Sequence, residues 1–258
     1  MYQAMISEIA KNKLENFKPS FDEINKKMSP SELLKNSEKN GISGDSLEQN
    51  DLKKSTEDTL KIRLKEELPE CNDSNINKIK GNISEQLMDE YFKKSGWEKI
   101  QGEVGVNGID GLYVKRDKDG NITNVLMSES KYNTSQLGDT KDGKQMSKDW
   151  IIKKLDNLEK AYPDNQDYSQ IKDLVNDDKY RARLWQVNEV DNTLHISLKK
   201  IDSTGNEVSI SQLSGNENYK INKIPEIDLK APTDSYHKSI SDSYTTIVDN
   251  NINKAKNI

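Results

Sequence analysis

Residues 108–131 hold the pattern that most restricts how this chain can fold. Two short apolar runs, Leu112-Tyr113-Val114 and Val125-Leu126-Met127, are separated by the polar turn Lys118-Asp119-Gly120-Asn121. Apolar runs on both sides of such a turn predict a β-hairpin. The second strand is expected to be buried, because its apolar residues are consecutive.

Charged residues stand at one end of this hairpin. Asp110 lies early on the first strand, Glu129 ends the second strand, and Lys131 follows two positions later. Residues i and i+2 of a strand share a face, so Glu129 and Lys131 should point the same way, with Asp110 within reach. A divalent cation, Mg²⁺ or alternatively Mn²⁺ or Zn²⁺, would offset the repulsion between the two carboxylates. The alternative is a surface ion pair, worth only about 0–1 kcal/mol.

These residues match a known signature. Asp110, followed 19 positions later by Glu129-Ser130-Lys131, resembles the D…E-x-K pattern of the PD-(D/E)XK, or restriction-endonuclease-like, nucleases. The later run, Leu137-Gly138 and then Lys141-Asp142-Gly143-Lys144-Gln145-Met146-Ser147, resembles nuclease domains at the C-termini of bacterial polymorphic toxins, including contact-dependent growth inhibition toxins. The resemblance covers residues 79–202.

The resemblance implies roles for individual residues. Asp110, Glu129 and the Ser130 carbonyl would bind the metal, and Lys131 would stabilise negative charge or position an attacking water. Glu85, on an expected first core helix over residues 82–92, matches an acidic residue that assists the metal site. The alternative for Glu85 is a capping box in the run Asn82-Ile83-Ser84-Glu85. The resemblance also implies that Gln145 contacts the metal-binding residues without binding the metal itself.

Basic residues near the signature are candidates for contacts to nucleic acid, although a solvated loop would carry similar charges. Residues 78–160 carry 15 Lys/Arg against 14 Asp/Glu, whereas the segments before and after each have a net charge of −3. A local positive groove is therefore compatible with the overall charge of −5. The candidates are Lys141, Lys144, Lys148, Arg181 and Arg183.

Composition limits the other classes of protein. The chain has 258 residues, of which 32% are hydrophobic and 32% charged, and no long apolar run predicts a membrane span or a signal peptide. One cysteine and two histidines exclude a cysteine-rich or histidine-based metal site.

We expect an α/β fold with a mixed sheet of four or five strands between helices. Residues 1–77 should form a helical appendage, for which the resemblance implies a role in cell entry, before a nuclease toxin domain over 78–258.

The sequence thus predicts a metal-dependent endonuclease toxin. By resemblance, it would be the secreted C-terminal part of a larger effector, act in the cytoplasm of a competing bacterium, and be neutralised by a cognate immunity protein. DNA is favoured over tRNA as substrate, because enzymes that use the 2′-hydroxyl often need a histidine base, and His195 and His237 are remote in sequence from the hairpin. A tRNA nuclease, a repair or restriction enzyme, and a catalytically silent nucleic-acid-binding module are the alternatives.

Overall fold

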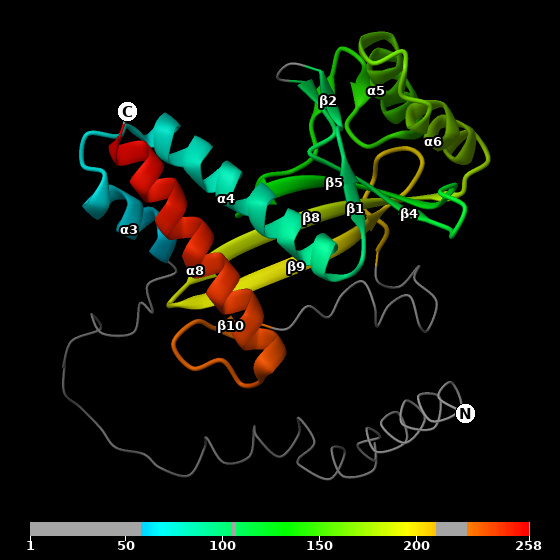
Figure 1. Ribbon diagram of the computed structural model, residues 1–258. Coiled ribbons are helices and arrows are strands. Elements are labelled where there is room, and N and C mark those ends of the chain that lie inside the picture. The colour runs from blue at the N-terminus through cyan, green and yellow to red at the C-terminus, as the bar shows by residue number, and fades with distance from the viewer. Residues whose placement is uncertain (1–57, 105–106, 210–225, 258) are drawn as a thin grey trace, which may run out of the picture. The chain divides into compact units, whose positions relative to one another are not determined.

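The computed structural model describes residues 58–104, 107–209 and 226–257 (Figure 1). They belong to one compact unit, Lys53–Ile258. Residues 1–57 of the segment expected as an appendage, 1–77, lie outside the described residues, so the expectation for them stays a prediction.

A six-stranded mixed sheet forms the centre of this unit. Its strand order is β1 (Glu98–Ile100), β4 (Gly111–Arg116), β5 (Ile122–Tyr132), β8 (Tyr180–Val190), β9 (Thr193–Ile201) and β10 (Ile227–Asp228). All neighbours are antiparallel except the central pair, β5 and β8. Two ribbons, β2 (Glu103–Val104) with β3 (Asn107–Gly108) and β6 (Asp139–Thr140) with β7 (Gly143–Lys144), lie outside it.

The predicted α/β class and the β4–β5 hairpin are confirmed. The predicted number of strands is wrong by one, because β10 adds an edge strand beside β9. This strand has only two residues and lies in a polar region, so it has no alternating apolar pattern that sequence analysis can detect.

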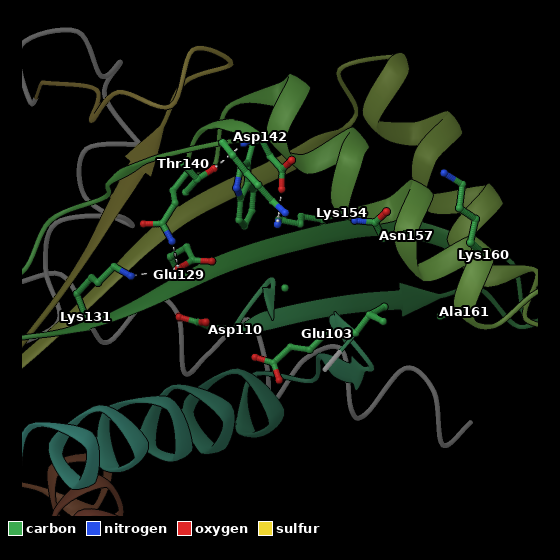
Figure 2. Close-up of a pocket in the computed structure, with 15 residues that line it drawn as sticks. Glu103, Asp110, Glu129, Lys131, Thr140, Asp142, Lys154, Asn157, Lys160 and Ala161 are labelled. Carbon is green, nitrogen blue, oxygen red and sulfur yellow. Dashed lines mark hydrogen bonds and ion pairs between the residues drawn. The ribbon is translucent and has the colours of Figure 1, made fainter. Parts of the chain in front are cut away.

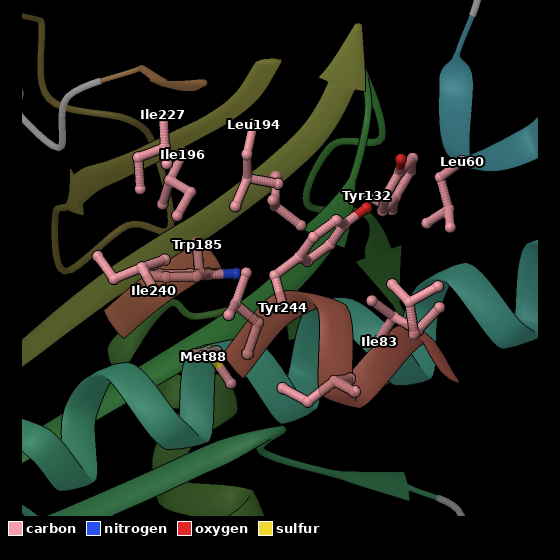
Figure 3. Close-up of a cluster of buried hydrophobic side chains, with 14 of the residues drawn as sticks. Leu60, Ile83, Met88, Tyr132, Trp185, Leu194, Ile196, Ile227, Ile240 and Tyr244 are labelled. Atoms are coloured by element: carbon pink, nitrogen blue, oxygen red, sulfur yellow. The ribbon is translucent and has the colours of Figure 1, made fainter. Parts of the chain in front are cut away.

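The described residues form five helices in two layers on the sheet (Figure 1). One hydrophobic cluster joins the sheet to α3 (Thr59–Glu67), α4 (Asp73–Lys94) and α8 (Ser235–Lys256), and Figure 3 shows part of it. A second cluster joins the sheet to α5 (Lys148–Ala161) and α6 (Asp167–Asn176). The α5–α6 segment connects the parallel strands β5 and β8, as a parallel pair requires a long crossover.

Helix α4 is longer than the expected helix over residues 82–92. It begins at Asp73, nine residues earlier, after the N-cap Asn72, whose side chain accepts a hydrogen bond from the Asn75 N–H. Asn82 and Glu85 therefore lie inside α4, where the Asn82 amide belongs to the helical ladder. The capping-box alternative for Glu85 is wrong.

Helix α4 spans the boundary expected between residues 77 and 78. The compact unit begins at Lys53, and α3 packs onto the sheet through Leu60 and Leu64. A short ion-pair network fixes the start of α3: Asp58 accepts hydrogen bonds from Lys80 Nζ at 2.8 Å and from the Tyr132 hydroxyl at 3.1 Å. Residues 58–77 are thus part of the core.

This packing predicts a large difference between two positions of α3. Leu64 is 0% exposed and Ile62 is 40% exposed. Leu64→Ala should lower the free energy of unfolding by about 2–5 kcal/mol, because it removes buried methyl groups and leaves a cavity. Ile62→Ala, the matched control, should change it by less than about 1 kcal/mol. Urea denaturation measures both, and equal midpoints for the two variants would show that α3 does not pack on the core.

Candidate active site

The register of β4 against β5 brings the two predicted carboxylates together. Gly111 pairs with Ser128, so Asp110, just before β4, lies beside the last residues of β5. The Ser130 backbone N–H donates a hydrogen bond to Asp110 Oδ2 at 2.9 Å, which fixes that carboxylate against the strand. The predicted convergence of Asp110 with Glu129 at one hairpin end is confirmed.

Alternation along β5 sends Glu129 and Lys131 to the face covered by α5, and Ser130 to the opposite face. Glu129 is 1% exposed. Its Oε2 accepts hydrogen bonds from Lys131 Nζ at 3.2 Å and from Gln145 Nε2 at 3.3 Å. Its Oε1 is buried and has no hydrogen-bond partner among the described residues. Glu129 is therefore a buried, partly unsatisfied carboxylate and not half of a surface ion pair.

Burial and the neighbouring Asp110 carboxylate raise the pKa of Glu129 to about 8, and the Lys131 ammonium opposes this shift. A divalent cation between the two carboxylates would favour the ionised form and supply a partner for Oε1. Asp110, Glu129 and the Ser130 carbonyl are oxygen donors of the kind that Mg²⁺ prefers. Within the described ranges, no three His, Cys, Asp or Glu side chains form a metal-binding group, so such a site would use two carboxylates.

A cavity of about 810 Å³ contains these groups (Figure 2). Asp110, Glu129, Lys131, Gln145 and Lys141 line it, as the sequence predicted for the site. Sequence analysis missed other charged or polar residues that line it; these are Glu103, Thr140, Asp142, Lys154, Asn157 and Lys160. Spacing gives a signal for part of this set: Trp150, Lys154 and Asn157 lie on one face of α5, four and then three residues apart.

Glu85 is close to this cavity but does not line it. Burial, followed by the Asp110 and Glu103 carboxylates, raises the pKa of Glu85 to about 7. Glu85 lies on α4, which covers the face of the sheet opposite to Glu129. The Asp110 carboxylate acts on Glu85 through its charge. No described contact joins Glu85 to Glu129.

Helix α4 contacts the site strand through a residue that sequence analysis missed. The Ser84 and Ser130 hydroxyls form a buried hydrogen bond of 2.7 Å, and Ser84 also donates to the Lys131 carbonyl at 3.4 Å. Ser130 occupies a position where a small apolar residue is commoner in the resembled family. Its hydroxyl is satisfied by Ser84, and this pair fixes the Glu129–Lys131 segment against α4.

The glycine after Asp110 is required by packing within the protein. A Cβ at Gly111 would lie 2.5 Å from Cε2 of the Tyr113 ring and 2.9 Å from the Met88 methyl group. The Tyr113 hydroxyl donates to Asp89 at 2.5 Å, which holds the ring in this position. Gly111 thus permits a close approach, and the group that approaches is an aromatic ring of the protein.

Four of the five basic candidates lie outside the cavity lining. Lys144 contacts the Asn206 side chain, and Lys148 donates to Asp178 at 2.6 Å and to the Asn176 carbonyl at 2.9 Å. Arg181 lies over the Trp97 ring, and Arg183 donates to the Ala182 carbonyl at 2.8 Å. The two arginines share the sheet face of the buried Trp185, opposite to the cavity.

No family model, curated protein or solved structure matches this chain. The likeness to PD-(D/E)XK nucleases therefore rests on the signature residues alone. No helix in the described ranges is long and apolar enough to cross a membrane.

The raised pKa of Glu129 predicts how stability varies with pH without metal. A folded-state pKa above the ordinary value of 4.5 gives stability that is present below pH 4.5 and lost as pH rises through about 8. In chelator at pH 9, Glu129→Gln should therefore melt at least about 3 °C above wild type, and the difference should shrink toward pH 5. Glu70→Gln, at an exposed position, should leave the profile unchanged. Thermal unfolding at each pH measures these profiles. Identical profiles for wild type and Glu129→Gln would contradict the raised pKa of Glu129.

Proposed function

We propose that this protein is a metal-dependent endonuclease that hydrolyses phosphodiester bonds of DNA. The observation that carries the proposal is the convergence of Asp110, Glu129 and Lys131 on one cavity, with Glu129 buried and its Oε1 without a partner. A carboxylate pair, an ammonium group and an open cavity are the components that hydrolysis of a phosphodiester requires.

Asp110, Glu129 and the Ser130 carbonyl would hold the divalent cation. When bound, the cation supplies Lewis-acid activation of the phosphate and of a water molecule. The other residues position these groups. Ser130 N–H orients the Asp110 carboxylate, and Gln145 Nε2 orients Glu129. The Lys131 ammonium lines the cavity beside Glu129, where it can stabilise the negative charge that develops on the phosphate in the transition state.

The positions of the histidines support DNA over RNA as substrate. His195, on β9, contacts Glu226 at 3.2 Å, and His237, on α8, contacts Thr233. Neither lines the cavity, so cleavage through the 2′-hydroxyl has no histidine base there. Attack by a water molecule needs no 2′-hydroxyl and acts on DNA. The same chemistry can cut tRNA, which the test below includes as a separate substrate.

The resemblance adds a biological setting to this proposal. The chain would be the toxic part of a larger secreted effector, act in the cytoplasm of a competing bacterium, and be inhibited by an immunity protein of the producing cell. Co-expression with the adjacent downstream gene tests this setting independently of the chemistry.

Two near-isosteric substitutions test the proposed catalysis. Asp110→Asn keeps an acceptor for the Ser130 N–H and removes a charge, and Lys131→Met removes the ammonium and keeps the chain length. Each should lower cleavage of supercoiled plasmid by about 10²-fold or more, with melting temperature close to that of wild type. Lys118→Met, in the exposed turn at the other end of β4 and β5, is the matched control and should cleave normally.

The assay uses purified protein with Mg²⁺, Mn²⁺ or Zn²⁺ and either plasmid or total tRNA. Wild-type rates in a folded Asp110→Asn protein would refute the assigned site. Cleavage of tRNA with plasmid left supercoiled under every metal would overturn the choice of DNA. Binding without any cleavage under all metals would favour the catalytically silent module.

A further inference from the structure

The lysines that line the cavity fall into two groups by their contacts. Lys131 is paired with Glu129 at 3.2 Å. Lys141 and Lys160 also line the cavity, and no hydrogen bond or ion pair joins the ammonium group of either to another described residue. By contrast, Lys144 and Lys148 lie outside the cavity lining and are bonded to other parts of the chain. Among these five lysines, the two whose ammonium groups have no partner in the described part of the chain both line the cavity.

Lys154 is the buried member of this set, with 10% of its side chain exposed. Its Nζ donates to Asp142 Oδ2 at 2.9 Å and lies 5.1 Å from the centre of the Trp150 ring. An ammonium group has three donors, and Asp142 is its one acceptor in the described part of the chain. The cation–π contact and the ion pair thus hold the largely buried ammonium group of Lys154 at the cavity. Two of its N–H donors have no acceptor in the described part of the chain.

Charge is divided between the two sides of the cavity. On one side, Glu103 comes from β2, Asp110 from the segment before β4, and Glu129 with Lys131 from β5. Lys154 and Lys160 come from α5, and Lys141 with Asp142 from the turn between β6 and β7. That second side has three lysines against one aspartate. Figure 2 shows Lys131 and Lys160 toward opposite ends of the cavity, with Lys154 between them.

This arrangement suits an extended polyanion. Lys154 and Lys160 are six residues apart, which is about 9 Å along a helix axis. One strand of B-DNA rises about 3.4 Å per nucleotide, so this distance spans about two to three nucleotides. A small phosphate ester held at the carboxylates would not reach both lysines, whereas a polynucleotide would.

We infer that Lys154 and Lys160 bind backbone phosphates of the polynucleotide on one side of the cleaved bond, so that this face of α5 positions the substrate strand. The inference rests on the proposed function for the identity of the ligand. Lys154 and Lys160 lie outside the carboxylate–lysine signature. They would act on binding of the polymer and not on the chemical step.

The test uses the full chain with Asp110→Asn, so that bound polynucleotide stays intact. Fluorescence anisotropy measures the Kd for a short labelled DNA duplex, and for an RNA hairpin, at several salt concentrations. The added pair Lys154→Gln and Lys160→Gln should raise the Kd by about tenfold or more and lower the salt slope by about 2, since each lost phosphate contact removes about 0.9. Lys118→Gln, with an equal charge loss at the far end of β4 and β5, should stay within about twofold. Lys160→Gln alone, at an exposed position, should lower the slope by about 1 and does not depend on the buried Lys154.

A second assay separates this inference from the proposed function. In the background with Asp110 intact, Lys160→Gln should raise KM for plasmid severalfold and leave cleavage of bis(p-nitrophenyl) phosphate, a small diester, unchanged. Lysine-dependent binding without any cleavage would support the inference and refute the nuclease. Cleavage with Kd, KM and salt slope unchanged in both lysine variants would refute the inference and leave the nuclease intact. If the pair binds DNA as the parent does and loses affinity only for RNA, the strand on α5 is RNA.

Discussion

The burial of the Glu129 carboxylate at the end of β5 is the interaction on which the rest of the site depends. A buried carboxylate with one unsatisfied oxygen costs several kcal/mol unless a proton, an ion pair or a cation compensates for it. Lys131 and Gln145 supply part of the compensation through Oε2. Asp110, held by the Ser130 N–H, adds a second carboxylate and charge repulsion. One more positive charge at this position would offset that repulsion.

The topology of the sheet explains why α5 faces this carboxylate. Strands β5 and β8 are the parallel pair, and their crossover must run over one face of the sheet, where it places α5 above Glu129. Ligands of open α/β sheets commonly bind outside the carboxyl ends of parallel strands, which is where Glu129 and Lys131 stand on β5. Helix α4 holds the same strand from the other face through the Ser84–Ser130 pair.

Sequence analysis succeeded where the signal is local. The hairpin turn and strand alternation predict that Asp110, Glu129 and Lys131 converge, and the structure has them together. Local patterns do not say which face of the sheet a helix covers. Sequence alone therefore does not place Glu85 on α4, in the layer opposite to Glu129, or Lys154 and Lys160 at the cavity. The docking of α3 was missed because its apolar stripe is thin, and Leu60 and Leu64 still bury fully.

The most direct test is the titration of the Glu129 side-chain carboxyl by ¹³C NMR, with and without Mg²⁺, with Glu129→Gln used to assign the signal. Without metal, the midpoint for Glu129 should lie near pH 8, because burial and the neighbouring Asp110 carboxylate disfavour its ionised form. Saturating Mg²⁺ should lower that midpoint by more than about one pH unit, because a cation at the site favours the ionised form. A midpoint near the ordinary value of 4.5 that Mg²⁺ does not move would contradict this account.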